Sequence, residues 1–461
     1  MKILLVRYHN EGNINTRFPE KLNKAQGVYH PLGIAYIAAV LEKKGYDVKV
    51  LDVQALNLTS AEARISILKE KADLVGITSM TSTFSGVLEC SRFAKESGAK
   101  TLVGGPQTST LPREVLTFDS VDFISIGDAE EMIPELIDAL ENNKPIDNII
   151  GLGYKKNGEI IMNPPAIVKD INKLPFPARH LLPMDKYDCI IAEKPFTTMI
   201  ATRGCPFKCG FCFRGVNDGM FRTRDPVNVV DEMEECVKKY GIKYIMFYDE
   251  TLTLRKENTR GICNEIIRRG LKVRWESPTR ADCVDEELLR LMKKAGCVRL
   301  RFGVESGNER ILKLMDKRIS LDKVRETFKT AKKIGIERFA YFVIGYFSED
   351  EKTIRDTINF AKEINPDWAM FLVATPLPNT PLMKLAVENG IVDENYWRDY
   401  SMGKTKERMP YLVKDADKWV KRAYREFYFR PSVILNKIKK LNSFDNLKKN
   451  IIGAYSILAN K

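Results

Sequence analysis

Three cysteines on one short stretch are the residues of this sequence whose types and spacing most clearly indicate chemistry. Cys205, Cys209 and Cys212 are spaced C-x3-C-x2-C, directly after a β-branched run (TTMIAT) that predicts a strand. A structural zinc site needs four protein ligands, and an ordinary iron–sulfur cluster needs four cysteines. No fourth cysteine lies close in the sequence, so the spacing favours a cluster with one iron open to a ligand that is not protein. The alternative is three free or zinc-binding thiols.

This stretch resembles the signature of the radical S-adenosylmethionine (radical SAM) superfamily, which has the same spacing and an aromatic residue before the last cysteine, here Phe211. The resemblance implies one 4Fe-4S cluster on the three cysteines, with S-adenosylmethionine chelated to the open iron and contacted by Phe211. In that family an electron from the cluster cleaves the sulfonium and gives a 5′-deoxyadenosyl radical. Gly204 and Gly210 suit a backbone that wraps closely around a cluster.

Residues 1–150 alternate short apolar strands with amphipathic helices. This alternation predicts an α/β fold built on a doubly wound parallel sheet. The expected strands lie at 2–7, 46–53, 73–80, 101–105 and 121–127, and the expected helices near 31–44, 60–71, 84–96 and 110–117. Ligands of such sheets bind beyond the carboxyl ends of the strands. Here those ends carry the small, polar loops Thr78–Ser82, Gly104–Thr108 and Gly127–Glu130.

This half resembles the cobalamin-binding domain that precedes many radical SAM enzymes, through the segments PLGIAYIAAVLEKKGYDVKVLD, GGPQTS and ISIGDAEE. The family commonly has histidine where this chain has Gln107, and the D-x-H-x-x-G motif of other cobalamin proteins is missing. The resemblance therefore implies cobalamin held without a protein histidine on that face, and His9 and His30 are interpreted as structural. The alternative is a nucleotide-type sheet that has lost its cofactor. The residues expected at cobalamin are Thr78, Ser79, Gly104, Gly105, Gln107, Thr108, Gly127 and Asp128.

Residues 151–190 are expected to connect two domains. A hairpin is predicted around Asn157-Gly158, because this dipeptide favours a tight two-residue turn. The following stretch LPFPARHLLPMDKY contains three prolines, which predicts an extended, packed linker. His180 lies in this linker and is interpreted as a structural hydrogen-bonding residue.

Residues 191–390 repeat a strand followed by helix six times, which predicts a partial (β/α)6 barrel. Sites in such barrels form at the carboxyl ends of the strands, and the cysteine stretch follows the first strand. In the resembling family the positions after strands two and four contact the amino group and ribose of S-adenosylmethionine. Asp249, Glu250 and Glu305 match those positions, and Arg280 is expected to meet the cofactor carboxylate. The alternative for each is a solvated charge at the rim.

The formal net charge of +13 is concentrated in the last region, residues 391–461. From Lys418 to Lys461 there are eleven Lys or Arg against two acidic residues. The basic character therefore belongs to a tail and does not indicate a nucleic-acid groove. Val420, Ala423, Tyr424 and Phe427 lie at helical spacing, which favours a helical cap on the barrel. The alternative is a surface that rests on an anionic membrane.

Composition limits the remaining classes of function. No apolar run is long enough to span a membrane, and the nine cysteines without a secretory signal indicate a reducing cytoplasm. The three histidines argue against chemistry that depends on several histidine ligands. Cys189, Cys236, Cys263, Cys283 and Cys297 are scattered along the chain, so no auxiliary iron–sulfur centre is expected.

The resemblance implies an oxygen-sensitive, cytoplasmic enzyme that needs an electron donor such as flavodoxin or ferredoxin. The first hypothesis is a cobalamin-dependent radical SAM methyltransferase acting on an unactivated carbon of a small-molecule or lipid-like substrate. The second keeps the radical and omits methyl transfer, as in enzymes that close rings, rearrange or couple carbon centres. The third is a cobalamin or redox sensor. The sequence does not identify the organic substrate.

Overall fold

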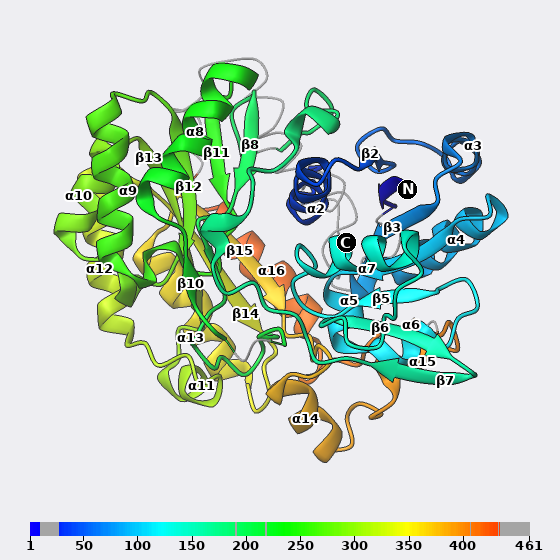
Figure 1. Cartoon of the computed structure of the whole chain (residues 1–461). Coiled ribbons are helices and arrows are strands. Elements are labelled where there is room, and N and C mark those ends of the chain that lie inside the picture. Colours follow the sequence, from blue (N-terminus) through cyan, green and yellow to red (C-terminus); the bar gives the residue numbers. More distant parts are fainter. Residues whose placement is uncertain (10–26, 190, 217–218, 406, 432, 434–461) are drawn as a thin grey trace.

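The computed structural model describes residues 1–9, 27–189, 191–216, 219–405, 407–431 and 433. Within these residues two large sheets are present, one of seven strands and one of six, together with a two-stranded ribbon. In Figure 1 the six-stranded sheet and its helices lie on the left, and the seven-stranded sheet lies on the right. The predicted α/β class is confirmed.

The first sheet has the strand order β2-β1-β3-β4-β5-β6-β7, and its first five strands are parallel. These are β2 (Asp47–Asp52), β1 (Lys2–Arg7), β3 (Leu74–Thr78), β4 (Lys100–Gly104) and β5 (Phe123–Ser125). Because successive side chains of a strand point to opposite faces, Ile3 and Leu5 pack against one set of helices and Leu4 and Val6 against the other. These sets are α2 (Leu32–Lys43) with α7 (Met132–Glu141), and α3 (Ser60–Glu70) with α4 (Phe84–Glu96).

The first domain differs from the sequence prediction in three places. Helix α7 was not predicted. The helix expected near 110–117 is split into α5 (Pro106–Thr110) and α6 (Pro112–Leu116), because proline does not continue a preceding helix. The predicted hairpin forms β6 (Leu152–Lys156) and β7 (Glu159–Met162), and β6 pairs antiparallel with β5. The first sheet therefore extends beyond residue 150, where the connector was expected to begin.

The second sheet has the order β15-β14-β13-β12-β11-β8, and every neighbouring pair is parallel. This arrangement confirms the predicted partial (β/α)6 barrel. Its strands are β8 (Phe196–Met199), β11 (Tyr244–Phe247), β12 (Arg274–Thr279), β13 (Cys297–Glu305), β14 (Glu337–Ile344) and β15 (Trp368–Val373). Its outer helices are α8 (Pro226–Tyr240), α9 (Lys256–Arg269), α10 (Glu286–Lys294), α12 (Leu321–Ile334) and α13 (Glu351–Ile364).

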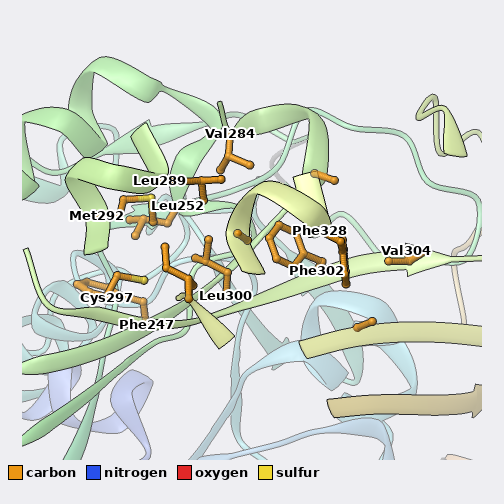
Figure 2. Packing of buried hydrophobic residues seen from close by; sticks show 14 of the residues in the cluster. Phe247, Leu252, Val284, Leu289, Met292, Cys297, Leu300, Phe302, Val304 and Phe328 are labelled. Carbon is orange, nitrogen blue, oxygen red and sulfur yellow. The ribbon is translucent and has the colours of Figure 1, made fainter. Parts of the chain in front are cut away.

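The core of the barrel lies between the strands and these helices, and outward-facing strand residues form its inner layer. Figure 2 shows Leu300 and Phe302 of β13 packed near Phe328 of α12 and Leu289 of α10. Local signals fix the helix ends. For example, the Asp225 side chain accepts from the backbone of Val227 at the start of α8, and a left-handed glycine, Gly241, ends that helix.

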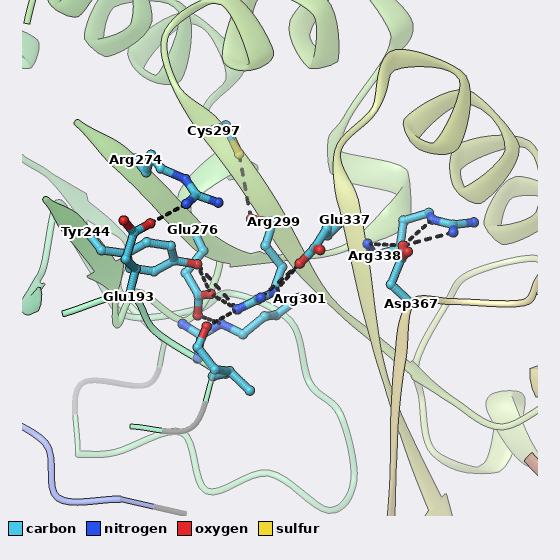
Figure 3. Close-up of polar contacts among 11 residues, drawn as sticks. Glu193, Tyr244, Arg274, Glu276, Cys297, Arg299, Arg301, Glu337, Arg338 and Asp367 are labelled. Atoms are coloured by element: carbon cyan, nitrogen blue, oxygen red, sulfur yellow. Dashed lines mark hydrogen bonds and ion pairs between the residues drawn. The ribbon is translucent and has the colours of Figure 1, made fainter. Parts of the chain in front are cut away.

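The inward-facing strand residues near the amino-terminal end of the barrel are charged. Glu276 is fully buried and accepts from the Tyr244 hydroxyl at 2.6 Å and from Arg299 Nη1 at 2.7 Å (Figure 3). Arg299 also donates to Glu337 at 2.8 Å, and Arg301 Nε lies 3.3 Å from Glu276. Buried charges persist only when they are paired. This network therefore closes the barrel interior at the end opposite the cysteines.

The C-terminal region covers the open edge of the barrel. Val420, Ala423 and Phe427 of α16 (Ala416–Tyr428) are buried against the barrel core, as the apolar spacing predicted. The Tyr428 hydroxyl accepts from the Ala369 amide at 3.0 Å and donates to the Ala369 carbonyl at 2.8 Å. The edge strand β15 thus gains partners for otherwise unpaired backbone groups.

The basic segments after residue 433 lie outside the described residues, so the expected membrane surface is not placed. Among the residues that are described, no helix combines the length and apolar character needed to cross a bilayer.

Candidate functional site

The three cysteines lie on a loop between two very short strands at the mouth of the barrel. β9 (Thr202–Arg203) and β10 (Arg222–Thr223) form an antiparallel ribbon just beyond β8, and residues 204–221 connect them. We call this connection the cysteine loop. Gly204 has φ +86°, and a Cβ there would lie 2.0 Å from a backbone oxygen of the loop's other end, at Met220. The loop can therefore close only with glycine at this position.

The middle of the cysteine loop is fixed by contacts with two later segments. The Gly210 amide donates to the Met315 carbonyl at 2.8 Å, and the Gly210 carbonyl accepts from the Leu382 amide at 2.8 Å. A Cβ on Gly210 would lie 2.6 Å from the Tyr346 hydroxyl. Phe211 packs into an apolar cluster that contains Met315 and Tyr346, so in this structure it supports the loop. Its expected contact with S-adenosylmethionine stays a prediction.

Burial and two nearby cations act in opposite directions on the pKa of the cysteine thiols. Burial raises the pKa of the Cys209 thiol, and the nearby cations of Lys317 and Arg280 oppose that rise. Each of the three thiolates binds a different iron, so the thiolates surround the cluster and do not converge on one point. Positively charged neighbours stabilise a thiolate. Within the described residues no three Cys, His, Asp or Glu side chains gather around the position of a single metal ion. The glycine-cradled loop and its two cations fit a cluster.

A buried ion pair stands beside this loop. Glu305 ends β13 with φ +69°, and Lys317 Nζ donates to Glu305 Oε1 at 2.8 Å. Both residues are less than a tenth exposed. A non-glycine residue in this backbone region is strained, and such strain concentrates at functional sites. The sequence prediction identified Glu305 and missed Lys317.

Arg280 joins the ion pair to the cysteine loop. Its guanidinium lies 3.7 Å from the ring centroid of Phe207, within the loop, and donates to the Lys317 carbonyl at 2.8 Å. Asp282 accepts from the same guanidinium at 2.8 and 3.0 Å. Arg280 Nη1 is buried and has no hydrogen-bond partner in the described part of the chain. A carboxylate and two cations thus face the cysteines, which is the set that the amino and carboxylate groups of S-adenosylmethionine require.

The two acidic residues after β11 have different surroundings. Asp249 is buried, and its carboxylate accepts from the backbone amides of Ala201 and Thr202 and from the Thr202 hydroxyl at 2.6 Å. Burial raises its pKa to about 7, against the effect of these hydrogen bonds. Asp249 therefore holds the chain that leads into the cysteine loop. Glu250 faces the cavity described next, and burial raises its pKa as well. The roles of both toward S-adenosylmethionine remain predictions.

A cavity of about 360 Å³ lies between the two domains. One wall is the carboxyl edge of the first sheet, and the opposite wall is the mouth of the barrel. Tyr248 follows β11 and lines the cavity from the barrel side. It is 41% exposed, and burial raises the pKa of its hydroxyl. The residues expected at cobalamin that line the cavity are Thr78, Gly104, Gly105, Gly127 and Asp128.

The three other residues expected at cobalamin lie beneath this surface. The Thr108 hydroxyl donates to the carbonyls of Gly105 and Ser125, and Gln107 Nε2 donates to Ser401 at 2.8 Å. Ser79 is fully buried. They are not cavity-lining residues. The sequence could not show this, because each belongs to a strand-end loop whose other members do face the cavity.

The cavity wall fits a large, flat, polar-edged ligand such as cobalamin. Gly33 opens directly onto the cavity, and a Cβ added there would meet nothing within 4 Å. The hydroxyl of Ser125, at the end of β5, is buried without a hydrogen-bond partner in the described structure, and Ser125 lines the cavity. Small residues and unpaired polar groups at strand ends are what such a ligand requires.

No histidine is available to a metal in this cavity. All three histidines of the chain lie within the described residues, and none of them lines the cavity. His30 packs against the Tyr187 ring at 4.0 Å, and burial lowers its pKa to about 3. His180 lies 2.9 Å from Glu42 at the surface. Both therefore behave as structural residues, as expected.

Comparison with known proteins supports the family resemblance that the sequence indicated for each of the two domains. The model of the radical SAM superfamily matches residues 199–361, and the model of the B12 binding domain matches residues 22–137. An uncharacterized methyltransferase of Pyrococcus horikoshii is 33% identical over 420 residues, which cover 90% of this chain and 91% of the relative. The anaerobic magnesium-protoporphyrin IX monomethyl ester cyclase of Rubrivivax gelatinosus is 29% identical over 78% of this chain and 66% of its own length.

A solved structure shows the same fold. The radical S-adenosylmethionine methyltransferase TsrM from Kitasatospora setae, with cobalamin and a [4Fe-4S] cluster bound, superposes with a TM-score of 0.73 at 16% identity, and the match covers 100% of both chains. The two family models, the fold and the full-length match to the Pyrococcus relative agree. This chain belongs to the cobalamin-binding radical SAM family, whose cofactors are a 4Fe-4S cluster, S-adenosylmethionine and cobalamin.

Proposed function

We propose that this protein methylates an unactivated carbon of an organic substrate. The observation that carries the proposal is the shared cavity, because the ends of the first sheet and the start of the cysteine loop line the same space of about 360 Å³. Hydrogen abstraction and methyl transfer must both reach one substrate carbon. A cavity bounded by the strand ends of the first sheet and by the base of the cysteine loop supports that requirement.

The residues that line the cavity and those beside the cysteine loop have separate tasks in this proposal. When bound, the cluster with S-adenosylmethionine supplies a carbon-centred radical, and cobalamin supplies the methyl group. Lys317, Arg280 and Glu305 hold the charged amino-acid part of S-adenosylmethionine, and Gly33 and Gly104 leave room for the corrin. Tyr248, between the two sites, faces the substrate. The domain interface keeps water from this space.

The names of the relatives support two reactions. The Pyrococcus relative is named a methyltransferase, which favours methyl transfer. The Rubrivivax relative is named a cyclase and matches 78% of this chain. A radical ring closure without methyl transfer is therefore the second candidate.

Product analysis separates the candidates. The cluster-loaded protein is incubated without oxygen with S-adenosylmethionine, hydroxocobalamin and a strong reductant. Methyl transfer predicts both 5′-deoxyadenosine and S-adenosylhomocysteine, whereas 5′-deoxyadenosine alone favours the cyclase-like reaction.

The triple variant Cys205→Ala, Cys209→Ala, Cys212→Ala should lose iron and both products. Cys90→Ala, at a buried cysteine of α4, is the matched control and should lose neither. Cluster-loaded wild type that yields neither product would refute both candidates.

We further propose that the protein works in the cytoplasm, is oxygen-sensitive, and receives its electrons from a flavodoxin or ferredoxin. The eleven basic residues between Lys418 and Lys461 support peripheral contact with an anionic membrane. Sedimentation with acidic liposomes at low and moderate salt tests that contact. Binding that weakens with salt is expected, and absence of binding at both salt concentrations would contradict it.

A further inference from the structure

Two arginines at the base of the cysteine loop reach from the barrel into the first domain. Arg203 lies in β9 immediately before the loop, and Arg222 lies in β10 immediately after it. The two residues are register partners across the ribbon. Whatever holds these two side chains therefore holds both ends of the loop that carries the three cysteines.

Their partners belong to the loop Gly127–Glu130 at the end of β5. Arg203 Nη1 lies 3.2 Å from Asp128 Oδ1, and Arg203 Nη2 lies 2.5 Å from Glu130 Oε1. Arg222 Nη1 donates to Asp128 Oδ2 at 2.5 Å. Asp128 thus receives both arginines, one on each oxygen, and Glu130 adds a second carboxylate. We call these four residues the interdomain clamp.

The interdomain clamp is shielded from solvent. Glu130 and Arg222 are less than a tenth exposed, and the side chains of Arg203 and Asp128 are 16% and 20% exposed. Two guanidinium groups face two carboxylates, so the charges balance. Buried, charge-assisted pairs of this kind are screened little by salt and fix orientation through the forked guanidinium. The Tyr36 ring of α2, 5.3 Å from the Arg203 guanidinium, further limits its movement.

All four clamp residues line the cavity between the domains. A ligand seated on the loop Gly127–Glu130 therefore contacts the carboxylates that hold the cysteine loop. We propose that Arg203 and Arg222 are positioning residues that couple occupation of this cavity to the order of the cysteine loop. This inference rests on the proposed function in one respect, because it takes cobalamin as the ligand of the cavity.

Hydrogen–deuterium exchange of residues 204–221 tests the coupling. In cluster-loaded wild type, hydroxocobalamin should slow amide exchange in this segment several-fold. In Arg203→Met and in Arg222→Met this slowing should disappear. A merely structural role would raise exchange equally with and without cobalamin. Arg255→Met is the matched control, because Arg255 is exposed and donates to Thr223 of the same ribbon at 3.4 Å. It should keep the slowing.

Two further variants keep the test decisive. Glu130→Gln removes one charge from the other side of the interface and should weaken the coupling in the same way, even where an arginine variant folds poorly. The exchanged pair Arg203→Glu with Glu130→Arg should restore part of it. Visible absorbance of the protein after gel filtration reports bound cobalamin. Wild type that retains none would refute the function and the coupling together. Retained cobalamin with equal slowing in the arginine variants would overturn the coupling alone.

Discussion

Lys317 and Glu305 form a buried ion pair in the site that we propose for the zwitterionic part of S-adenosylmethionine. A buried pair is costly to break from one side only, because the remaining charge loses its partner. A ligand with an ammonium and a carboxylate can replace this pair with two new ones. Its ammonium then pairs with Glu305 and its carboxylate with Lys317, so neither buried charge is left without a partner. Arg280, which contacts both Lys317 and the cysteine loop, places this exchange beside the cluster ligands.

Glu349 gives a pH-dependent prediction. Its Oε2 accepts from the backbone amides of Gly345 and Tyr346 at 2.6 and 3.0 Å, while Oε1 is buried without a partner among the described residues. Burial raises the pKa from 4.5 to about 7. As pH rises, Glu349 therefore loses its proton at a lower pH in the unfolded chain than in the folded protein. The contribution of Glu349 to stability is complete below pH 4.5 and is lost by about pH 7.

The variant Glu349→Gln removes this titration and keeps an acceptor oxygen. Between pH 4.5 and 8 the free energy of unfolding of wild type should fall by about 3 kcal/mol relative to the variant. Urea unfolding of the apoprotein at several pH values measures the difference. Glu351→Gln, at an exposed glutamate two positions away, is the control and should follow wild type. Parallel profiles for Glu349→Gln and wild type would contradict the assignment.

Single residues were predictable where their chemistry depends on local spacing. The cysteines share one loop, so their spacing alone indicated a ligand set. Lys317 was not predictable, because it follows the short helix α11 (Glu309–Leu314) and reaches Glu305 only through the folded chain. Gln107 illustrates a further limit. Gly104 and Gly105 of its loop line the cavity, but the side chain of Gln107 does not and donates to Ser401.

The open edge of the barrel gives a prediction at the level of elements. The hydroxyl of Tyr428 is the partner of both backbone groups of Ala369 in β15. Tyr428→Phe would leave an amide and a carbonyl without these bonds, at a cost of about 1–3 kcal/mol. Urea unfolding measures this loss. Tyr46→Phe, at a half-buried tyrosine of the first domain, is the matched control and should change stability little. A Tyr428→Phe variant as stable as the control would refute this role.

Elements with strong local signals were predicted with accurate limits. Helix α4 begins and ends where the sequence placed it. Helix α8 has a capping aspartate, an initial proline and a terminal glycine, which are signals that the sequence shows directly. The ribbon of β9 and β10 was missed, because strands of two residues have no periodic pattern. The hairpin was predicted, but its place in the first sheet depends on pairing with β5, which is a contact distant in sequence.

At the scale of the molecule, the arrangement of the two domains decides the function. Arg179 of the connector is fully buried and donates to Glu232 of α8 at 2.6 Å, which fixes the connector to the barrel. Asn379 donates to Thr110 at 2.9 Å, so the region after the barrel returns to the first domain. These contacts join segments far apart in sequence. The sequence therefore predicted two cofactor domains, but not that the strand ends of the first sheet and the base of the cysteine loop line one cavity.

Electron paramagnetic resonance tests this shared cavity most directly. The protein is loaded with both the cluster and cobalamin and reduced so that the cluster and cob(II)alamin are both paramagnetic. Sites that face one cavity predict spectra broadened or split by magnetic coupling between the two centres, compared with protein that holds only one of them. A spectrum equal to the sum of the two separate signals would contradict the account.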